Sequence, residues 1–402
     1  MTEAATPAAD VYRLGTAQGG ALHRRLLITA AVAGLLSLLG AVLDYRQFFW
    51  SYLTAFVFVL SLGVGALFWV MIHHLTDAGW SVVVRRTMEH LCATVPWLAL
   101  LFVPVLAGMG TLYAWTHAHA PDDPHYHLWA LKRPYLNVPF FVVRAAVYFG
   151  VWGWLAWNLT RWSTQQDDSG DPELTRRLQR LSAPGMILLG LTTTFAAFDW
   201  LMSLDYEWYS TIYGVFFCAG AMISSLALLT LLVLCMRAAG LLRHTITVEH
   251  LHDLGKLLFG FTIFGTYIAF SQYFLIWYGN IPEETRWFVN RERDTWYGVG
   301  WVLLFGRFLV PFFVFLPRWS KRSPLVLSVM CVWLLVFQFL DLHWQVMPML
   351  HTQGFRPHWL DFSLLVALVA ACGLIVQQSF RSRALIPIRD PRLAESLRFH
   401  NN

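Results

Sequence analysis

The chain has 402 residues, of which 57% are hydrophobic and only 13% carry a charge. A soluble domain usually has about 25% charged residues, so this composition excludes a soluble globular protein and makes lipid the solvent for much of the surface. The formal net charge of +5 would suggest a nucleic-acid partner in a soluble protein, but the Arg residues here cluster between apolar segments, which indicates membrane topology and no nucleic-acid partner.

The first 24 residues are mostly polar and predict an N-terminal tail without the pattern of a cleaved signal peptide. Residues 25–380 are then expected to form a polytopic membrane domain, and residues 381–402 a C-terminal tail. A membrane span needs about 20 mostly apolar residues, and ten segments meet or nearly meet this length: 25–43, 50–72, 93–115, 138–158, 184–203, 209–235, 255–278, 297–316, 325–346 and 361–379. The predicted fold class is therefore all-α integral membrane, with about ten transmembrane helices.

Two connections between the predicted spans are longer than the others, residues 116–137 and 159–183, and both are short enough to be loops. The second is acidic and then basic, and its last part is expected to form a surface helix that enters the fifth span. The first contains a cluster of His and Asp residues: His117, His119, Asp122, Asp123, His125 and His127. Such a cluster can bind a metal ion, but we interpret it as a polar loop broken by Pro residues.

The placement of His and Cys argues against redox centres in this chain. All 15 His residues fall in predicted loops, tails or end turns of spans, and the five Cys residues are scattered without a C-x-x-C pair. A membrane b-type haem needs axial His residues within facing helices, and an iron–sulfur cluster needs several Cys ligands. The chain is therefore expected to hold no haem, cluster or metal ion by itself, and to conduct no electrons over a long distance.

The distribution of Lys and Arg predicts the orientation. If the two tails and the even-numbered loops share one side, that side holds 20 of the 29 Lys and Arg residues and the other side holds 7. The remaining two, Arg144 and Arg307, lie within spans. Because loops rich in Lys and Arg stay on the cytoplasmic side, both termini are expected in the cytoplasm.

Charged residues within spans are costly and are functional candidates by default. Those that stand out are Arg144, Asp199, Arg307 and Asp341. Counting from the span ends places Arg307 near mid-membrane and the other three nearer the periplasm, with Gln272 in the outer third of the seventh span. The cytoplasmic halves offer mainly hydroxyl groups and Lys256. Two interpretations follow, a buried ion-pair network or a polar cavity open to the periplasm, and the one-sided distribution favours the cavity.

Asp199 is predicted to be the centre of a proton half-path that opens to the periplasm. Burial and a neighbouring Arg, either Arg144 or Arg307, act in opposite directions on a carboxyl group, which can leave it able to exchange protons near neutral pH. Gln272 and Asp341 are predicted at a similar depth and could extend a chain of water molecules outward. Aromatic residues flank Asp199 in the sequence, an arrangement that suits a quinone ring and equally suits ordinary packing.

Three segments carry a family resemblance. They read YLNVPFFVVR at 135–144, FAAFDWLMSLDYEWYSTIYG at 195–214 and LGKLLFGFTIFGTYIAFSQYFLIWYGNIPEET at 254–285. Together with the length and the number of spans, they resemble the second of two polysulfide-reductase-like (NrfD-type) membrane subunits of bacterial alternative complex III, a quinol:cytochrome c (electron acceptor) oxidoreductase. The positions that match the family motifs are Arg144, Asp199, Asp205, Lys256 and Gln272.

The resemblance implies ten helices in two four-helix bundles with a flanking pair, placed in a bacterial cytoplasmic membrane. It implies as partners a related NrfD-type subunit, c-type cytochrome subunits, and a periplasmic subunit similar to iron–sulfur and molybdopterin enzymes. Those partners would hold the haem c and the iron–sulfur clusters. Subunits of this type are named as quinone-binding, but the resemblance implies that the related NrfD-type subunit is the better placed for quinol oxidation. The chain would not be catalytic alone, but would contribute a site for quinol or protons, or a proton half-path, and anchor periplasmic subunits.

Two other functions stay open. A secondary transporter would favour polar groups at mid-membrane and inverted repeats with broken helices, and neither is clear in this sequence. A purely structural membrane anchor would fit the aromatic-rich outer loop 279–296. Co-purification with redox subunits would separate these functions.

Overall fold

The computed structural model describes residues 12 and 16–401, and within these residues it contains helices and no strand. Ten helical segments of this part are long and apolar enough to cross a membrane. The predicted fold class, an all-α integral membrane protein, is therefore confirmed. Most of the predicted N-terminal tail, residues 1–11 and 13–15, lies outside the described residues.

The helices follow one another in the order α1 (Thr16–Leu43), α2 (Tyr45–Leu75), α3 (Val82–Cys92), α4 (Val95–Leu101), α5 (Val103–Ala107), α6 (Met109–Leu112), η1 (Ala114–Thr116), α7 (Tyr126–Lys132), α8 (Val138–Ser169), α9 (Pro172–Trp200), η2 (Met202–Asp205), α10 (Tyr213–Ala238), α11 (Val248–Gly279), α12 (Pro282–Val289), α13 (Asp294–Leu303), η3 (Leu304–Leu309), α14 (Val310–Phe315), α15 (Arg318–Arg322), α16 (Pro324–Val346), η4 (Met347–Met349), α17 (Trp359–Ser382) and α18 (Leu393–Leu397). Two spans are interrupted: the third runs through α3, α4 and α5, and the eighth runs through α13, η3 and α14. Pro96, Pro104 and Pro311 are the second residues of α4, α5 and α14, and each lacks the N–H that would continue the hydrogen bonds of the helical segment before it.

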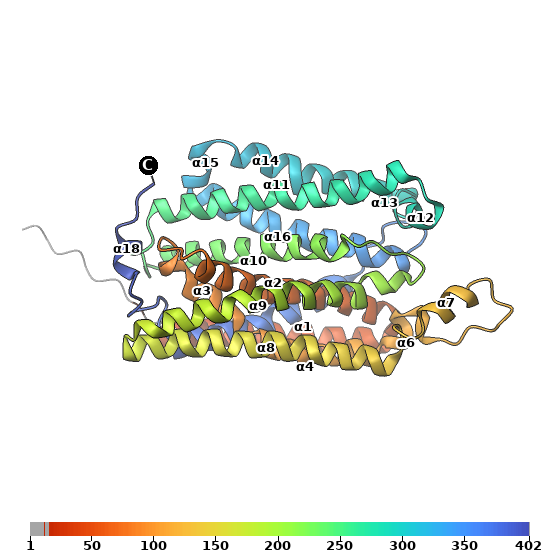
Figure 1. Cartoon of the computed structure of the whole chain (residues 1–402), viewed down its shortest axis with the longest axis horizontal. Coiled ribbons are helices and arrows are strands. Elements are labelled where there is room, and N and C mark those ends of the chain that lie inside the picture. Colours follow the sequence, from red (N-terminus) through yellow and green to blue (C-terminus); the bar gives the residue numbers. More distant parts are fainter. Residues whose placement is uncertain (1–11, 13–15, 402) are drawn as a thin grey trace, which may run out of the picture.

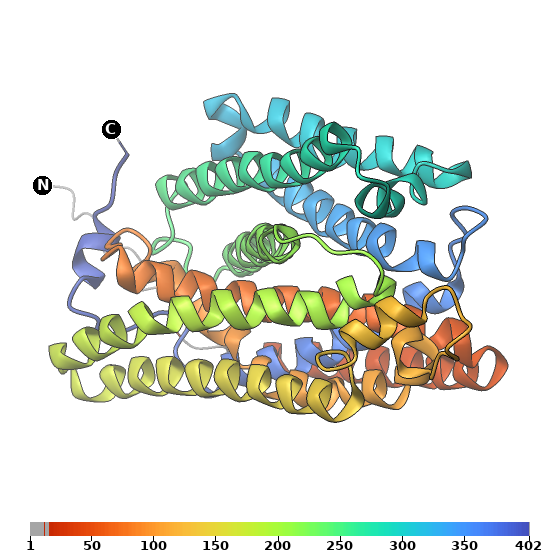
Figure 2. The ribbon, with the colours of Figure 1, turned by 45° about the vertical axis from the view of Figure 1, so that its right-hand side comes forward.

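The long helices form two bundles and a flanking pair. The first bundle consists of α2, α3–α6, α8 and α9, and the second consists of α10, α11, α13–α14 and α16. Helices α2 and α10 pack against each other and join the bundles, while α1 pairs with α17 on the outside of α2. Figure 1 shows α8 and α11 on opposite sides of the molecule, and the turned view in Figure 2 shows the same separation.

The two ends of the bundle differ in character. The end that carries α15, α18 and the C-terminal residues is named the tail end, and the opposite end, with α7, η2 and α12, is named the loop end (Figure 1). Helix α2 is almost wholly buried between the two bundles, whereas α1 exposes most of its apolar side chains. Exposed Leu and Val side chains on α1 are what a lipid-facing helix requires.

Two helices extend well beyond the predicted spans. The helical segment that contains the third predicted span begins at Val82, and the predicted loop 159–183 is helical except for Gly170 and Asp171. Gly170 ends α8 in the left-handed conformation at a φ of 68°, and the Asp171 side chain caps α9 by accepting from the Glu173 backbone N–H. The predicted surface helix is therefore real, but it is continuous with the fifth span.

Candidate functional site

The first charged pair lies in the first bundle, near the loop end. Arg144 on α8 donates to both carboxylate oxygens of Asp199 on α9, from Nε to Oδ2 at 2.8 Å and from Nη2 to Oδ1 at 2.9 Å. The Tyr148 hydroxyl donates to the same Oδ2 at 2.7 Å. The Arg144 guanidinium also lies 3.8 Å from the ring centroid of Tyr135 and 4.3 Å from that of Phe140. Asp199 is fully buried, and both of its oxygens are occupied.

An aromatic cluster lies beside this pair and contacts it through the ring of Tyr148, which packs against Trp152 and Trp200. Ring contacts join the members of this cluster: Phe56, Phe102, Tyr113, Phe141, Phe149, Trp152 and Trp200. Neither of the two cavities described below is lined by Asp199. A bidentate ion pair in such a closed setting is an anchor between α8 and α9, since a buried pair of this geometry is costly to break.

The second charged pair lies in the second bundle. Arg307 forms an ion pair with Asp341 on α16 and donates from Nη2 to Gln338 Oε1 at 2.9 Å. The Gln345 amide donates to Asp341 Oδ2 at 2.8 Å, and the Tyr213 hydroxyl donates to Gln345 Oε1 at 2.8 Å. This pair is therefore one part of a hydrogen-bonded chain that reaches from α10 across α16.

A π-helical turn, η3, positions Arg307. Such turns widen a helix locally and occur frequently at functional sites. Gly306 precedes Arg307 and packs directly against Phe337, where a Cβ atom would overlap the ring. The Trp333 indole N–H donates to the Gly306 carbonyl at 2.6 Å. Close approach of α16 to this turn thus depends on Gly at position 306.

Arg307 and Asp341 line a cavity of about 730 Å³ between α10, α11, α13–η3 and α16, named here the second-bundle cavity. Its walls are mainly rings: Phe216, Tyr267, Phe270, Tyr273, Trp287, Phe288, Tyr297, Trp301, Phe308 and Trp344. Several of these rings on α11 and α13 are exposed on the outer surface of the bundle, so the cavity opens toward lipid. Ligand cavities in proteins commonly have about 300–1,000 Å³.

Gln272 on α11 lines the same cavity. Its side chain is only 4% exposed, and its amide makes no hydrogen bond within the described residues. An amide without a protein partner at the wall of a cavity usually has a ligand or water as its partner in a native site. The cavity thus brings Gln272 together with the ion pair of Arg307 and Asp341.

Arg291 closes the cavity at the loop end. It is 1% exposed, its guanidinium lies 3.5 Å from the ring centroid of Trp287, and it donates to backbone carbonyl oxygens of Trp287, Trp344 and Gln345. Burial lowers the pKa of Arg291 to about 9, although Tyr213 and Asp205 favour its charged form. No carboxylate forms an ion pair with it within the described residues.

The other two predicted site residues lie elsewhere. Asp205 is 5% exposed in η2 at the loop end, and its Oδ2 atom has no hydrogen-bond partner within the described residues. Lys256 lies at the tail end, where it pairs with Asp253 and donates to Asn401 Oδ1 at 2.9 Å. Lys256 therefore contacts the C-terminal residues and does not line the second-bundle cavity.

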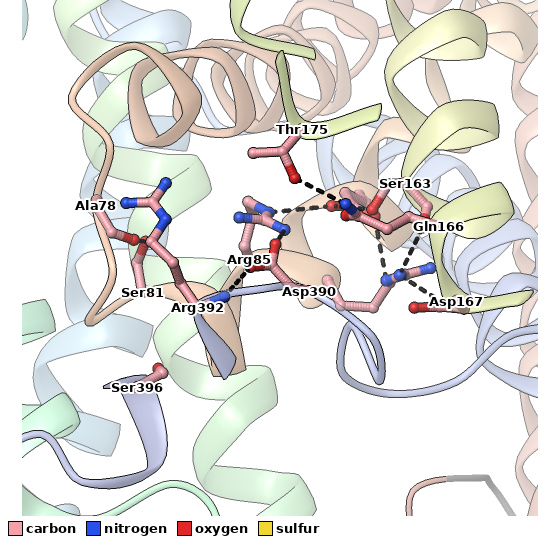
Figure 3. Close-up of polar contacts among 12 residues, drawn as sticks. Ala78, Ser81, Arg85, Ser163, Gln166, Asp167, Thr175, Asp390, Arg392 and Ser396 are labelled. Carbon is pink, nitrogen blue, oxygen red and sulfur yellow. Dashed lines mark hydrogen bonds and ion pairs between the residues drawn. The ribbon is translucent and has the colours of Figure 1, made fainter. Parts of the chain in front are cut away.

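A third charged cluster lies at the tail end, on a helical segment outside the predicted spans. Arg85, Arg86 and Glu89 on α3 are each at most 1% exposed. Arg85 Nη2 lies 2.6 Å from Asp390 Oδ2, and Figure 3 shows Asp390 against Arg85. Arg86 Nη2 lies 2.7 Å from Asp167 Oδ2 on α8. Arg85 and Arg86 stand four and three positions before Glu89, the spacing of ion pairs on one face of a helix. This spacing in the sequence indicates part of the network.

Residues 384–401 lie across this cluster and are named the C-terminal strap. The Ile388 backbone N–H donates to Asp167 Oδ1 at 2.9 Å, and the Ser396 hydroxyl donates to the Trp80 carbonyl at 2.7 Å. Arg392 forms an ion pair with Asp77 (Figure 3 shows Arg392 beside the turn that follows α2). The strap therefore ties α3, α8 and the α2–α3 turn together.

Asp390→Asn is expected to loosen the C-terminal strap, because it removes a buried ion pair at a cost of about 3 kcal/mol. Burial alone would raise the pKa of Asp390, but the Arg85 guanidinium outweighs burial and holds that pKa below the usual range. The pair therefore stabilises the strap at every pH above the ordinary aspartate pKa and loses its effect only as pH falls below it. Hydrogen exchange of residues 384–401 in detergent measures the change, with exposed Asp168→Asn as the control. Equal protection in both variants would contradict the prediction.

Two of the four His residues of loop 116–137 lie against acids. His119 Nδ1 lies 2.8 Å from Asp123 Oδ2, and His125 Nδ1 lies 2.5 Å from Glu207 Oε1. Within the described residues there is no group of three or more side chains able to hold a metal ion. The side chains of this loop thus make acid–base pairs that attach it to η2 and its neighbours.

The structure separates the predicted site residues into distinct places. Gln272, Arg307 and Asp341 meet at one cavity, whereas Arg144 and Asp199 form a closed pair in the other bundle. No hydrogen bond links Asp199 to that cavity within the described residues, so the water chain from Asp199 stays a prediction. No family model matches the sequence, and no curated protein matches it at a significant level.

Proposed function

We propose that this chain is a membrane subunit of a quinol:electron-acceptor oxidoreductase complex and that the second-bundle cavity handles quinol or the protons released from it. The observation that carries the proposal is the unpartnered Gln272 amide, which lines the cavity together with the Arg307–Asp341 pair. A quinol headgroup is a flat ring with polar oxygens at opposite ends. Aromatic walls with an amide and a carboxylate suit such a ring.

The chemistry of quinol oxidation assigns a role to each group. Oxidation of a quinol releases two protons and two electrons, and an ionised carboxylate beside the ring can accept one proton. Asp341 is the carboxylate in the cavity, Arg307 and Gln345 hold its orientation, and Gln272 can donate to a quinol oxygen. The electrons would pass to centres in partner subunits.

The resemblance to NrfD-type subunits of alternative complex III supports this proposal independently. One of the three similar segments, 254–285, contains Gln272 on α11. The two four-helix bundles and the flanking pair α1–α17 agree with what the resemblance implies. The loop end, with η2 and α12, would then be the surface that docks periplasmic redox subunits.

The orientation follows from the same proposal, with the tail end in the cytoplasm of a bacterial cell, as the Lys and Arg distribution favours. A Cys added after Asn402 is expected to resist impermeant thiol reagents in intact spheroplasts, and Asp122→Cys in loop 116–137 is expected to react. The background should carry Cys235→Ser, because Cys235 is exposed near the tail end. Equal labelling at both added positions would overturn the orientation.

Purification of the tagged chain in a mild detergent tests the proposed function. We expect co-purification of subunits with haem c absorbance and iron–sulfur signals, and quinol-dependent reduction of an electron acceptor. A folded chain that purifies without redox subunits and transports a solute in vesicles would favour a secondary transporter instead. A complex in which every variant of the second-bundle cavity keeps full turnover would leave only a structural anchor.

A further inference from the structure

A second cavity lies on the lipid-facing side of the first bundle near the tail end. It has about 540 Å³ and runs between the α3–α4 junction, α8 and the end of α17; we name it the tail-end groove. None of the predicted site residues lines it. Its lining is cationic at one end and apolar at the other.

Cations without acidic partners mark one end of the tail-end groove. Arg161 on α8 is exposed and lies 4.9 Å from the ring centroid of Trp157, and Arg383 follows α17 with only a 3.5 Å contact to Ser379 Oγ. Neither guanidinium forms an ion pair within the described residues, although many other Arg residues at this end do. Two unpaired guanidinium groups at one groove form a site for an anion.

Apolar side chains line the other end. Trp97 and Trp157 are 53% and 56% exposed, which suits rings in contact with lipid near the headgroup level. Ile375 precedes Arg383 by two turns of α17, or about 12 Å along the axis at the usual helical rise. The groove therefore presents a cationic end toward the tail end of the molecule and an apolar end toward the middle of the bilayer.

We infer that the tail-end groove binds an anionic phospholipid, with its phosphate between Arg161 and Arg383 and an acyl chain along Trp97, Trp157 and Ile375. A free phosphate would use only the cationic end. A zwitterionic lipid carries the same phosphate, but the two guanidinium groups repel its headgroup cation. An anionic lipid uses both ends of the groove without that repulsion. The charge of the two guanidinium groups and the apolar wall beside them together select this class of ligand.

The groove shares its wall with the buried cluster at the tail end. Thr164 on α8 lines the groove and accepts from Arg86 Nη1 at 3.5 Å, and Ser379 on α17 lines it and is hydrogen-bonded to His90 at 2.8 Å. A lipid in the groove would therefore contact the same helices that the C-terminal strap holds together. We expect its binding to stabilise the tail end of the protein.

Lipid binding to the purified chain, measured by native mass spectrometry, tests the inference. We expect phosphatidylglycerol to bind roughly thirtyfold more tightly than phosphatidylcholine, the effect of two cations at a membrane surface. Arg161→Gln/Arg383→Gln should reduce this ratio to about one, while binding of phosphatidylcholine stays unchanged. The ratio compares two lipids on one protein sample, so a change in overall stability does not mimic the effect.

Two controls make the test decisive. Arg176→Gln/Arg180→Gln removes two cations on α9 near the same end, which are 71% and 73% exposed and paired with Glu173; the lipid ratio should persist in this variant. Inorganic phosphate should compete only weakly with phosphatidylglycerol. Loss of the ratio in both double variants, or full competition by inorganic phosphate, would overturn the inference.

Discussion

Asp341→Asn is expected to lower quinol oxidation by the intact complex about a hundredfold or more, the usual contribution of a positioned proton acceptor. The change keeps the shape of the side chain and retains hydrogen bonding to Gln345, but it removes the charge that pairs with Arg307 and the ability to take a proton. The rate of acceptor reduction as a function of pH measures the effect, and we expect the variant to lose the pH dependence of the native complex.

Asp199→Asn is the matched control for that experiment. Both carboxylates are buried and paired with Arg, but only Asp341 lines a cavity. We therefore expect Asp199→Asn to change turnover less than about threefold in complexes that assemble, a small effect on the scale of proton-transfer catalysis. If Asp199 is instead the proton centre, as predicted from the sequence, Asp199→Asn should lower turnover more than Asp341→Asn does. Loss of turnover with Asp199→Asn and full turnover with Asp341→Asn would move the site to the first bundle.

Arg144→Leu is expected to lower the free energy of unfolding by about 3–5 kcal/mol, because it leaves Asp199 buried with only Tyr148 as a side-chain partner. Removing both charges in Arg144→Leu/Asp199→Leu should recover much of this loss, since an apolar pair of similar volume leaves no buried charge. Unfolding of the detergent-solubilised chain in denaturant gives both values. A double variant that is at least as unstable as Arg144→Leu would contradict the prediction.

Hydropathy was sufficient to locate all ten spans, because each needs a run of apolar residues that loops cannot supply. It was insufficient at the tail end. Arg85, Arg86 and Glu89 interrupt the apolar run, but they pair with Asp390 and Asp167 from distant segments, so the helix continues through them. Hydropathy places the end of a span at the first charged residues, because the sequence does not show that distant residues neutralise them.

The charged candidates were visible in the sequence, but their pairing was not. Arg144 and Asp199 are 55 positions apart, and their contact depends on how α8 packs against α9. Gln272 was predicted at a depth similar to that of Asp199, and it lies in the other bundle. Depth along a span does not indicate which neighbouring helix a side chain faces. The second-bundle cavity could not be predicted from the sequence either, because the aromatic residues that line it do not differ in type from those elsewhere on these helices.

A density map of the purified complex with its quinol would show where the headgroup binds. We expect flat density in the second-bundle cavity, with one polar end within hydrogen-bond reach of Gln272 and the other near Asp341. Acyl-chain density filling that cavity, together with quinol or ordered water against Asp199, would contradict this expectation.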